Sequence, residues 1–298
     1  MEKIDLHVHT SYSDGALDIE SLLKEAKKNK IKTVAITDHE TIEGLTGYQK
    51  ASQKYDIEII PGIEMNVSHP GMHVLGYGIK DFRKVESVFE NIKIKNEQVV
   101  FDTIRLLQKN GYDIDEYDVV TAAQEYYDYK KQKLENNSDI FRFNKKFILT
   151  KTDVAKTLVN LGYSRNIDDS YKKLIGPNTK NYIRTDKIDT RDAIGLVIDS
   201  GGTAVLAHPM TVNIRHTNLI NVCKQLETYG LEGIEAYGPR FSDKQKESYI
   251  SIAKYFGFLM TAGTDFHNPG HTLGIAVPNS VVYNLNNNIK RKNLTRQV

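Results

Sequence analysis

Hydrophobic and polar residues alternate at the beginning of the chain. In residues 3–8 (KIDLHV), Ile4, Leu6 and Val8 share one face of an extended segment, and polar side chains occupy the other. This period of two predicts a strand. Short apolar runs predict further strands, and helical spacing predicts the helices between them. The predicted strands are 31–40, 57–67 and 72–79, and the predicted helices are 16–30 and 41–55.

The pattern changes from about Arg83 to Arg184, where apolar positions recur at helical spacing among many charged residues. This spacing predicts helices, and a polar, irregular stretch between two of them predicts a loop. The predicted helices are 85–112, 115–135, 151–163 and 166–176, and the predicted loop is 136–147. Because α/β patterning resumes afterwards, we interpret residues 83–185 as an all-α insertion.

Strands and helices alternate again in the last third of the chain. The predicted strands are 203–209, 231–239 and 258–267, and the predicted helices are 191–202, 216–230 and 243–257. Tight alternation of strand and helix is typical of parallel βα units. We therefore predict one discontinuous α/β domain, a helical insertion that shapes the pocket as a lid, and an exposed polar tail. Their bounds are 1–82 with 186–285, 83–185 and 286–298.

Composition narrows the function classes. The 298 residues are 40% hydrophobic and 26% charged, with a net charge of +2, which is too weak to indicate a nucleic-acid or membrane surface. One cysteine excludes an internal disulfide and a thiolate cluster. No apolar run approaches the length of about 20 residues that a membrane span needs. We expect a cytoplasmic protein with no membrane partner and no stable nucleic-acid complex.

Histidines and carboxylates cluster at the ends of the predicted strands. Six of the nine histidines stand there: His7, His9, His39, His73, His208 and His267. The carboxylates in the same places are Asp14, Asp38, Glu64, Glu235 and Asp265. In a barrel of parallel strands the carboxyl ends meet at one rim, where active sites are built. These side chains are therefore predicted to meet in one pocket.

Strand geometry pairs several of these residues. Side chains at i and i+2 lie on the same face, so His7 and His9 can reach one ion or a close pair of ions. Asp265 and His267 share a face in the same way if their strand continues. A single histidine at a strand end is usually a structural polar group, but a set of this size predicts a metal site.

The donor types restrict the ions and the chemistry. Asp38 and His39 fall on opposite faces, so we assign the ion to His39 and a supporting or capping role to Asp38. Imidazole and carboxylate without thiolate favour Zn, Mn or Fe. The donors outnumber what one ion can use, which indicates two or three divalent ions. Clustered ions activate water and stabilise a leaving alkoxide, so hydrolysis of a phosphate ester is the leading chemistry.

These segments resemble a known family. "DLHVHTSYSDG", "AITDHETIEG", "PGIEMN", "HVLGY", "VLAHP" and "AGTDFH" are similar, in order, to the motifs of the PHP (polymerase and histidinol phosphatase) superfamily. The resemblance implies an α/β fold, a distorted (β/α)7 TIM-like barrel. "AKTLVNLGYSRNIDDSYKKLIG" and "DAIGLVIDSGGTAVLAHP" are similar to the subgroup that dephosphorylates nucleotides.

The resemblance also implies a trinuclear site, with a hydroxide bridging two ions that attacks phosphorus. The first ion would be held by His7, His9, Glu64 and Asp265. Glu64 would bridge to the second, held also by His73 and His208. The third would be held by Asp14, His39 and His267. The catalytic residues implied are these ligands except His73, which is a metal ligand only, and all nine positions carry the expected residue type.

Two departures from the subgroup concern the substrate. Lys151 stands where the subgroup has an Arg-Pro-His run, and Arg240 follows a strand where it has a histidine. Either residue can supply a cation for phosphate. The expected substrate is a small phosphomonoester, a nucleotide such as 5′-AMP or a 3′,5′-bisphosphate. The alternatives are hydrolysis of histidinol phosphate or a cyclic phosphate, 5′-3′ exonuclease action on short RNA, and a metal-binding module without catalysis.

Overall fold

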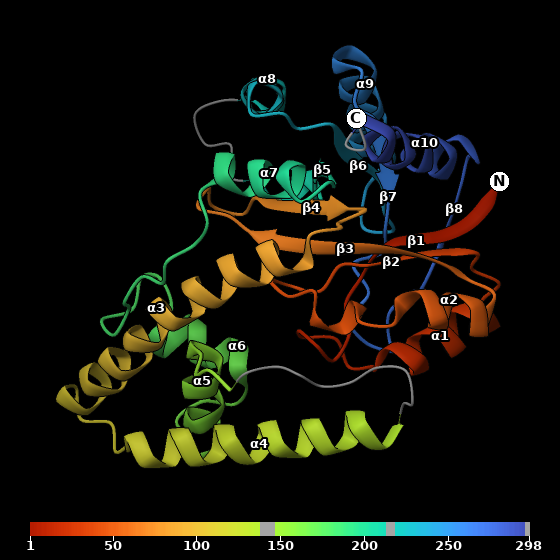
Figure 1. Ribbon diagram of the computed structural model, residues 1–298. Coiled ribbons are helices and arrows are strands. Elements are labelled where there is room, and N and C mark those ends of the chain that lie inside the picture. The colour runs from red at the N-terminus through yellow and green to blue at the C-terminus, as the bar shows by residue number, and fades with distance from the viewer. Residues whose placement is uncertain (138–146, 213–217, 296–298) are drawn as a thin grey trace. The chain divides into compact units, whose positions relative to one another are not determined.

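The computed structural model describes residues 1–137, 147–212 and 218–295 (Figure 1). Among these residues the chain divides into a barrel unit, residues 1–87 with 137, 188–212 and 218–295, and a helical unit, residues 88–136 with 147–187. Helix α3 (Phe82–Lys109) contains the boundary between them. The loop predicted at 136–147 lies almost wholly outside the described residues. The lid role of the insertion stays a prediction.

A single sheet forms the centre of the barrel unit. Its described strands are β1 (Glu2–Val8), β2 (Thr33–Ile36), β3 (Glu58–Asn66), β4 (His73–Tyr77), β5 (Thr203–Leu206), β6 (Gly233–Tyr237), β7 (Leu259–Ala262) and β8 (Ile275–Val277). Their order across the sheet is β7-β6-β5-β4-β3-β2-β1-β8. Every residue of β2 and β5 is buried, which explains why both read as continuous apolar runs in the sequence.

The sheet curls back on itself through the segment that follows β7. Val8 at the end of β1 forms a parallel bridge with Phe266. The N–H of His9 donates to the carbonyl of Phe266 at 2.8 Å, and the N–H of Phe266 donates to the carbonyl of His7 at 3.2 Å. The result is a nearly closed barrel, so the predicted α/β barrel is confirmed.

Two strands depart from the all-parallel arrangement that was predicted. β4 is antiparallel to both β3 and β5, and β8 is antiparallel to β1. A parallel crossover needs a dozen or more residues, whereas only residues 67–72 connect β3 to β4. The short connection therefore forces β4 to run back along β3.

The helices of the barrel unit follow the predicted alternation. They are α1 (Ile19–Lys28), α2 (Tyr48–Tyr55), α7 (Thr190–Asp199), α8 (Leu219–Thr228), α9 (Asp243–Phe256) and α10 (Ser280–Thr295), with short 3-10 turns η1 (Glu43–Leu45) and η3 (Pro209–Thr211). The helix predicted at 41–55 is divided into η1 and α2, because Gly47 adopts φ 87° in front of α2.

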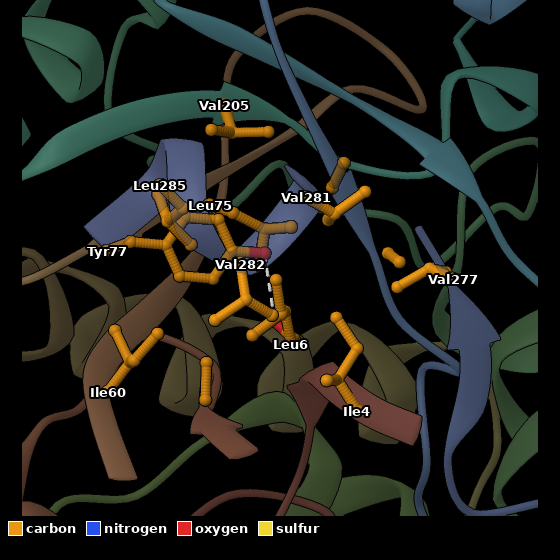
Figure 2. Packing of buried hydrophobic residues seen from close by; sticks show 13 residues of the cluster. Ile4, Leu6, Ile60, Leu75, Tyr77, Val205, Val277, Val281, Val282 and Leu285 are labelled. Carbon is orange, nitrogen blue, oxygen red and sulfur yellow. Dashed lines mark hydrogen bonds between the residues drawn. The ribbon is translucent and has the colours of Figure 1, made fainter. Parts of the chain in front are cut away.

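Helix α10 corrects the predicted polar tail. Residues 286–295 continue this helix, and Val281, Val282 and Leu285 on it belong to the barrel core (Figure 2). The polar side chains of its second half are also used: Asn288 is 7% exposed and donates to Oγ1 of Thr203 at 3.0 Å. The asparagines at 286–288 led to the prediction of an exposed tail, because asparagine is typical of turns and loops when its hydrogen-bond partners are unknown.

Figure 2 shows the barrel core beneath α10, with Tyr77 among the aliphatic side chains. The hydroxyl of Tyr77 donates to the carbonyl of Leu6 at 2.8 Å, so the one polar atom of this ring is satisfied inside the core. This bond ties β4 to β1 across the barrel.

The helical unit has a core of its own. Besides the remainder of α3 it contains α4 (Glu116–Asn137), α5 (Lys151–Asn160), α6 (Ile167–Ser170) and the π-helical turn η2 (Tyr171–Ile175). Ile104, Leu107, Val119 and Leu158 are buried together there. A capping box on Thr150 begins α5, which satisfies the first backbone N–H groups of the helix.

Among the described residues, no helix combines the length and the apolar character that crossing a membrane requires.

Candidate metal centre

Strand β1 and the residue that directly follows it supply the first two donors, His7 on the strand and His9 just after it. His7 and His9 are both fully buried, because the strand is enclosed by the barrel on both faces. Asp5 on the same strand accepts hydrogen bonds from the N–H groups of Thr264 (3.0 Å) and Gly274 (2.9 Å). Burial raises the pKa of Asp5 to about 6, although these bonds oppose the shift. Asp5 therefore fixes β1 to the segments that follow β7.

The sequence-predicted donors come together at one rim of the barrel. In each of three sets, one donor atom per residue lies within 4.8 Å of every other donor atom. The sets are His7, His9, Glu64 and Asp265; His9, Asp14, His39 and His267; and His39, Glu64 and His73. His208 joins them through Nε2, which lies 2.8 Å from Oε1 of Glu64.

The spacing of the first set fits a shared cation. Nε2 of His7 lies 3.0 Å from Oε2 of Glu64 and 3.5 Å from Oδ1 of Asp265. Nε2 of His9 lies 3.0 and 3.2 Å from the same two oxygens. Donors that are each about 2.1 Å from one ion lie about 3.0 Å apart at a right angle and about 3.4 Å apart in a tetrahedron. The four residues therefore suit a divalent ion.

His9 gives a second indication of an ion. Both of its ring nitrogens are buried, and neither has a hydrogen-bond partner among the described residues. Nε2 nevertheless faces Glu64 and Asp265, and Nδ1 lies 3.4 Å from Oδ1 of Asp14. Buried polar atoms are rarely left without a partner. Nitrogen and oxygen atoms that lie this close without hydrogen-bonding geometry are typical of side chains arranged around a metal ion.

Two imidazoles have an oxygen partner at Nδ1, the ring nitrogen that does not contact Glu64. Nδ1 of His7 lies 3.2 Å from Oε1 of Glu235, and Nδ1 of His208 lies 2.8 Å from Oγ1 of Thr211. When Nδ1 carries the proton toward these acceptors, the lone pair of Nε2 is directed at Glu64. This tautomer is the one that binds an ion through Nε2.

The segment after β7 delivers the last donors, but not as a strand. β7 ends at Ala262, and Asp265 adopts a left-handed backbone with φ 55°. The strand predicted at 258–267 is therefore too long, and the condition for Asp265 and His267 to share a strand face is not met. Nδ1 of His267 bonds the carbonyl of Asp265 at 2.8 Å, which leaves Nε2 at 3.4 Å from Oδ2 of Asp14.

His73 and Asp38 lie in positions that refine the prediction. His73 is the first residue of β4, not the last, and it reaches this rim because β4 is antiparallel. Asp38 is 2% exposed and accepts from the N–H (2.7 Å) and hydroxyl (2.6 Å) of Thr10 and from the hydroxyl of Ser13 (2.5 Å). Asp38 thus anchors the loop that carries Asp14, a supporting role of the kind expected.

Charge within the cluster is strongly coupled. Burial opposes the charge on His9, but Asp265 and Glu64 outweigh it and raise the pKa of His9 to about 9. Burial opposes the charge on Glu64 too, yet His7 and His39 hold its pKa well below the usual value. Burial lowers the pKa of His39 to about 4. Ions and protons therefore compete for these nitrogens, and ion binding releases protons.

The two predicted phosphate-binding cations have different surroundings. Arg240 forms an ion pair with Oδ2 of Asp265 through Nη2, and its side chain is 53% exposed. Lys151, in the helical unit, is buried and donates from Nζ to the carbonyls of Ile175 (2.9 Å) and Ile183 (3.0 Å). The ammonium of Lys151 is thus engaged within its own unit, and its contact with substrate stays a prediction.

Three supporting residues were not among the predicted site residues. Glu235 was noted as a carboxylate at a strand end, which was the available signal. Asp5 could have been suspected as a charged residue inside a strand with two buried faces. Thr211 carried no signal, since a threonine in a short turn has many ordinary uses.

The family is established by the sequence. The model of the PHP domain matches residues 5–186, more than half of the chain. The chain belongs to the PHP family and is a hydrolase of its metal-dependent phosphoesterase class. This confirms the resemblance on which the sequence analysis relied.

Named relatives extend over nearly the whole chain. A 5′-3′ exoribonuclease of Haemophilus influenzae is 24% identical over 271 residues, 90% of this chain and 91% of the relative. A 3′,5′-nucleoside bisphosphate phosphatase of Chromobacterium violaceum is 24% identical over 272 residues, 91% of this chain and 89% of the relative. A solved amidohydrolase structure from Chromobacterium violaceum superposes with a TM-score of 0.74 at 22% identity, covering 96% of each chain, and shows the same fold.

Proposed function

We propose that this protein hydrolyses a small phosphomonoester, most simply a nucleotide such as 5′-AMP or a 3′,5′-bisphosphate, with two or three bound divalent ions. The observation that carries the proposal is the convergence of nine imidazole and carboxylate residues, one of which, Glu64, is close to several of the others. Such a concentration of donors suits several ions, and Mn, Zn and Fe are the candidates.

The residues divide into three ligand groups in this proposal. His7, His9, Glu64 and Asp265 would hold one ion; Glu64, His73 and His208 a second; and Asp14, His39 and His267 a third. When bound, the ions would supply an activated water and would neutralise charge on the phosphoryl oxygens. The surrounding residues fix where the phosphate can enter.

The cluster is buried at His7, His9 and Glu64 and partly exposed at Asp14 and His267, the side that we call the open side. The side chains of His7 and His9 are 0% exposed and that of Glu64 is 1% exposed. By contrast, His267 is 26% exposed and Asp14 is 54% exposed. A phosphate group would therefore approach from the side of Asp14 and His267.

Arg240 would bind that phosphate. One nitrogen of its guanidinium is paired with Asp265, which places the group beside the cluster, and the side chain is 53% exposed. A guanidinium presents five donors in a planar fork, so it can hold an anion while keeping the aspartate. Arg240 would thus position the phosphoryl group for attack.

A substrate panel tests the proposal. Phosphate release would be measured with 5′-AMP, a 3′,5′-bisphosphate, histidinol phosphate and a cyclic phosphate, each with and without added Mn²⁺. We expect metal-dependent release that is fastest with a nucleotide monoester. Fastest release from a non-nucleotide would overturn the substrate class, and no release from any of them would overturn the phosphatase.

Exoribonuclease action is the second candidate, because one relative of almost equal coverage carries that name. Shortening of a 5′-labelled oligoribonucleotide, followed by gel electrophoresis, separates the two. Stepwise degradation faster than release from 5′-AMP would favour the exoribonuclease over the monoesterase.

A further inference from the structure

Glu235 contacts two of the proposed ligands with its two oxygens. Oε1 lies 3.2 Å from Nδ1 of His7, and Oε2 accepts from the backbone N–H of His208 at 2.7 Å. Glu235 is 2% exposed and lies on β6, whereas His7 lies on β1 and His208 follows β5. One buried carboxylate on β6 thus connects two proposed ligands, one on β1 and one just after β5.

The chain leaves room for this contact at Gly263. A Cβ atom there would lie 2.2 Å from Cβ of His7 and 2.8 Å from Oε1 of Glu235. Any side chain at this position would push His7 and Glu235 apart. The absence of a side chain at residue 263, just after β7, therefore lets the side chain of Glu235 on β6 reach His7 on β1.

We infer that Glu235 is a positioning residue that holds His7 with its proton on Nδ1 and its Nε2 lone pair directed at the ion cluster. This inference rests on the proposed metal-dependent function. A carboxylate accepts hydrogen bonds and donates none when ionised, so it selects the Nδ1–H form of the imidazole. Carboxylates behind metal-binding histidines orient the ring and raise its basicity.

The competing explanation is purely structural. Glu235 satisfies the backbone N–H of His208, and its contact with His7 would then be incidental. The two explanations differ in what Glu235→Gln does. Glutamine offers one acceptor oxygen, whereas both contacts of Glu235 need an acceptor. If the amide nitrogen faces His7, the ring must move its proton to Nε2, the atom that should bind the ion.

Affinity for Zn²⁺ is the first measurement, by competition with a chromophoric chelator. Glu235→Gln is compared with the wild type and with Glu247→Gln, the same change at an exposed position on α9. We expect Glu235→Gln to weaken Zn²⁺ binding by about 10- to 100-fold and Glu247→Gln to leave it unchanged. Unchanged affinity in a folded Glu235→Gln protein would overturn the inference.

The tautomer of His7 is the second measurement, by ¹⁵N-resolved NMR of histidine side chains in the Zn²⁺-loaded protein. The wild type should show an Nδ1–H proton and an ion-bound Nε2 on His7. This result needs no variant, so it decides the question even if Glu235→Gln does not fold. A His7 ring that binds Zn²⁺ through Nδ1 would contradict the inference.

The two measurements also separate this inference from the proposed function. A wild type that binds no Zn²⁺ would overturn both. A wild type that binds Zn²⁺ and releases phosphate, together with an unchanged Zn²⁺ affinity in Glu235→Gln, would overturn the positioning role alone.

Discussion

Arg240 and Asp265 share an ion pair in which the aspartate also faces the histidine cluster. Arg240 contacts Oδ2, while Oδ1 lies 3.2 Å from Nε2 of His9. Burial opposes the charge on Asp265, but His9 and His7 outweigh it and lower the pKa of this carboxyl. The aspartate thus joins the proposed phosphate-binding cation to the proposed ion site.

Replacing Arg240 should weaken substrate binding more than turnover. Arg240→Ala removes charge-assisted hydrogen bonds to phosphate, which are worth about 1.5–3 kcal/mol each, so kcat/KM should fall at least about tenfold, mainly through KM. Steady-state kinetics with 5′-AMP measures this. Lys244→Ala, which removes a cation from an exposed position on α9, is the control and should leave KM unchanged. An unaltered KM in Arg240→Ala would exclude the phosphate contact.

Loss of a central donor should abolish phosphate release. His9→Ala and Asp265→Asn each remove a donor from the same set, so metal-dependent release should fall to background while circular dichroism still shows a folded protein. His271→Ala, at an exposed position, serves as the control. Full activity in either donor variant would rule out the proposed site.

Glu64 should matter more for ion content than Asp14. Glu64 lies within 3.0 Å of His7, His73 and His208, whereas Asp14 is 54% exposed at the open side. Elemental analysis of protein purified without chelator should therefore show a larger loss of bound ions in Glu64→Gln than in Asp14→Asn. Equal losses would mean that Glu64 is not shared between ions.

Asn288→Ala should destabilise the barrel unit. The side chain of Asn288 donates to Thr203 at 3.0 Å and to Oε2 of Glu232 at 2.9 Å, and both bonds would be lost. A loss of about 1–3 kcal/mol in the free energy of unfolding is expected, measured by urea denaturation. Asn287→Ala, one position earlier and exposed, should change it by less than about 0.5 kcal/mol.

Cys223 should be unreactive in the folded protein. The residue is fully buried on α8, and burial raises the pKa of its thiol to about 12. At pH 8 only about one thiol in ten thousand would be ionised, so alkylation should be slow until denaturant is added. Mass spectrometry of iodoacetamide-treated protein measures this. Because unfolding lowers this pKa, stability should decrease as the pH rises above about 8.5.

Local periodicity was sufficient to predict much of the fold. The alternation that begins at Lys3 predicted His7 and His9 on one face, and the structure has both in one donor set, although β1 ends at Val8. Apolar spacing predicted the helix at 16–30, which contains α1, and the structure begins that helix after the cap residue Asp18. These features depend on neighbouring residues, which a sequence displays directly.

Other features depend on partners distant in the chain and could not be predicted. The left-handed backbone of Asp265 comes directly after Thr264, which bonds Asp5 across 259 positions of the chain. The helical conformation of residues 286–295 depends on partners such as Thr203. The antiparallel direction of β4 could have been predicted from the sequence, because the six residues 67–72 are too few for a parallel crossover.

The pairing of the first and last strands has a consequence for the order of folding. β1 lies between β2 and β8, and Glu2 pairs with Val277. Pairings of such long range close slowly, because the entropy of a large loop must be lost before the contact forms. A chain folded only through β6 would hold His9 and Glu64 without Asp265. A divalent ion therefore meets the complete first donor set only after the barrel has closed.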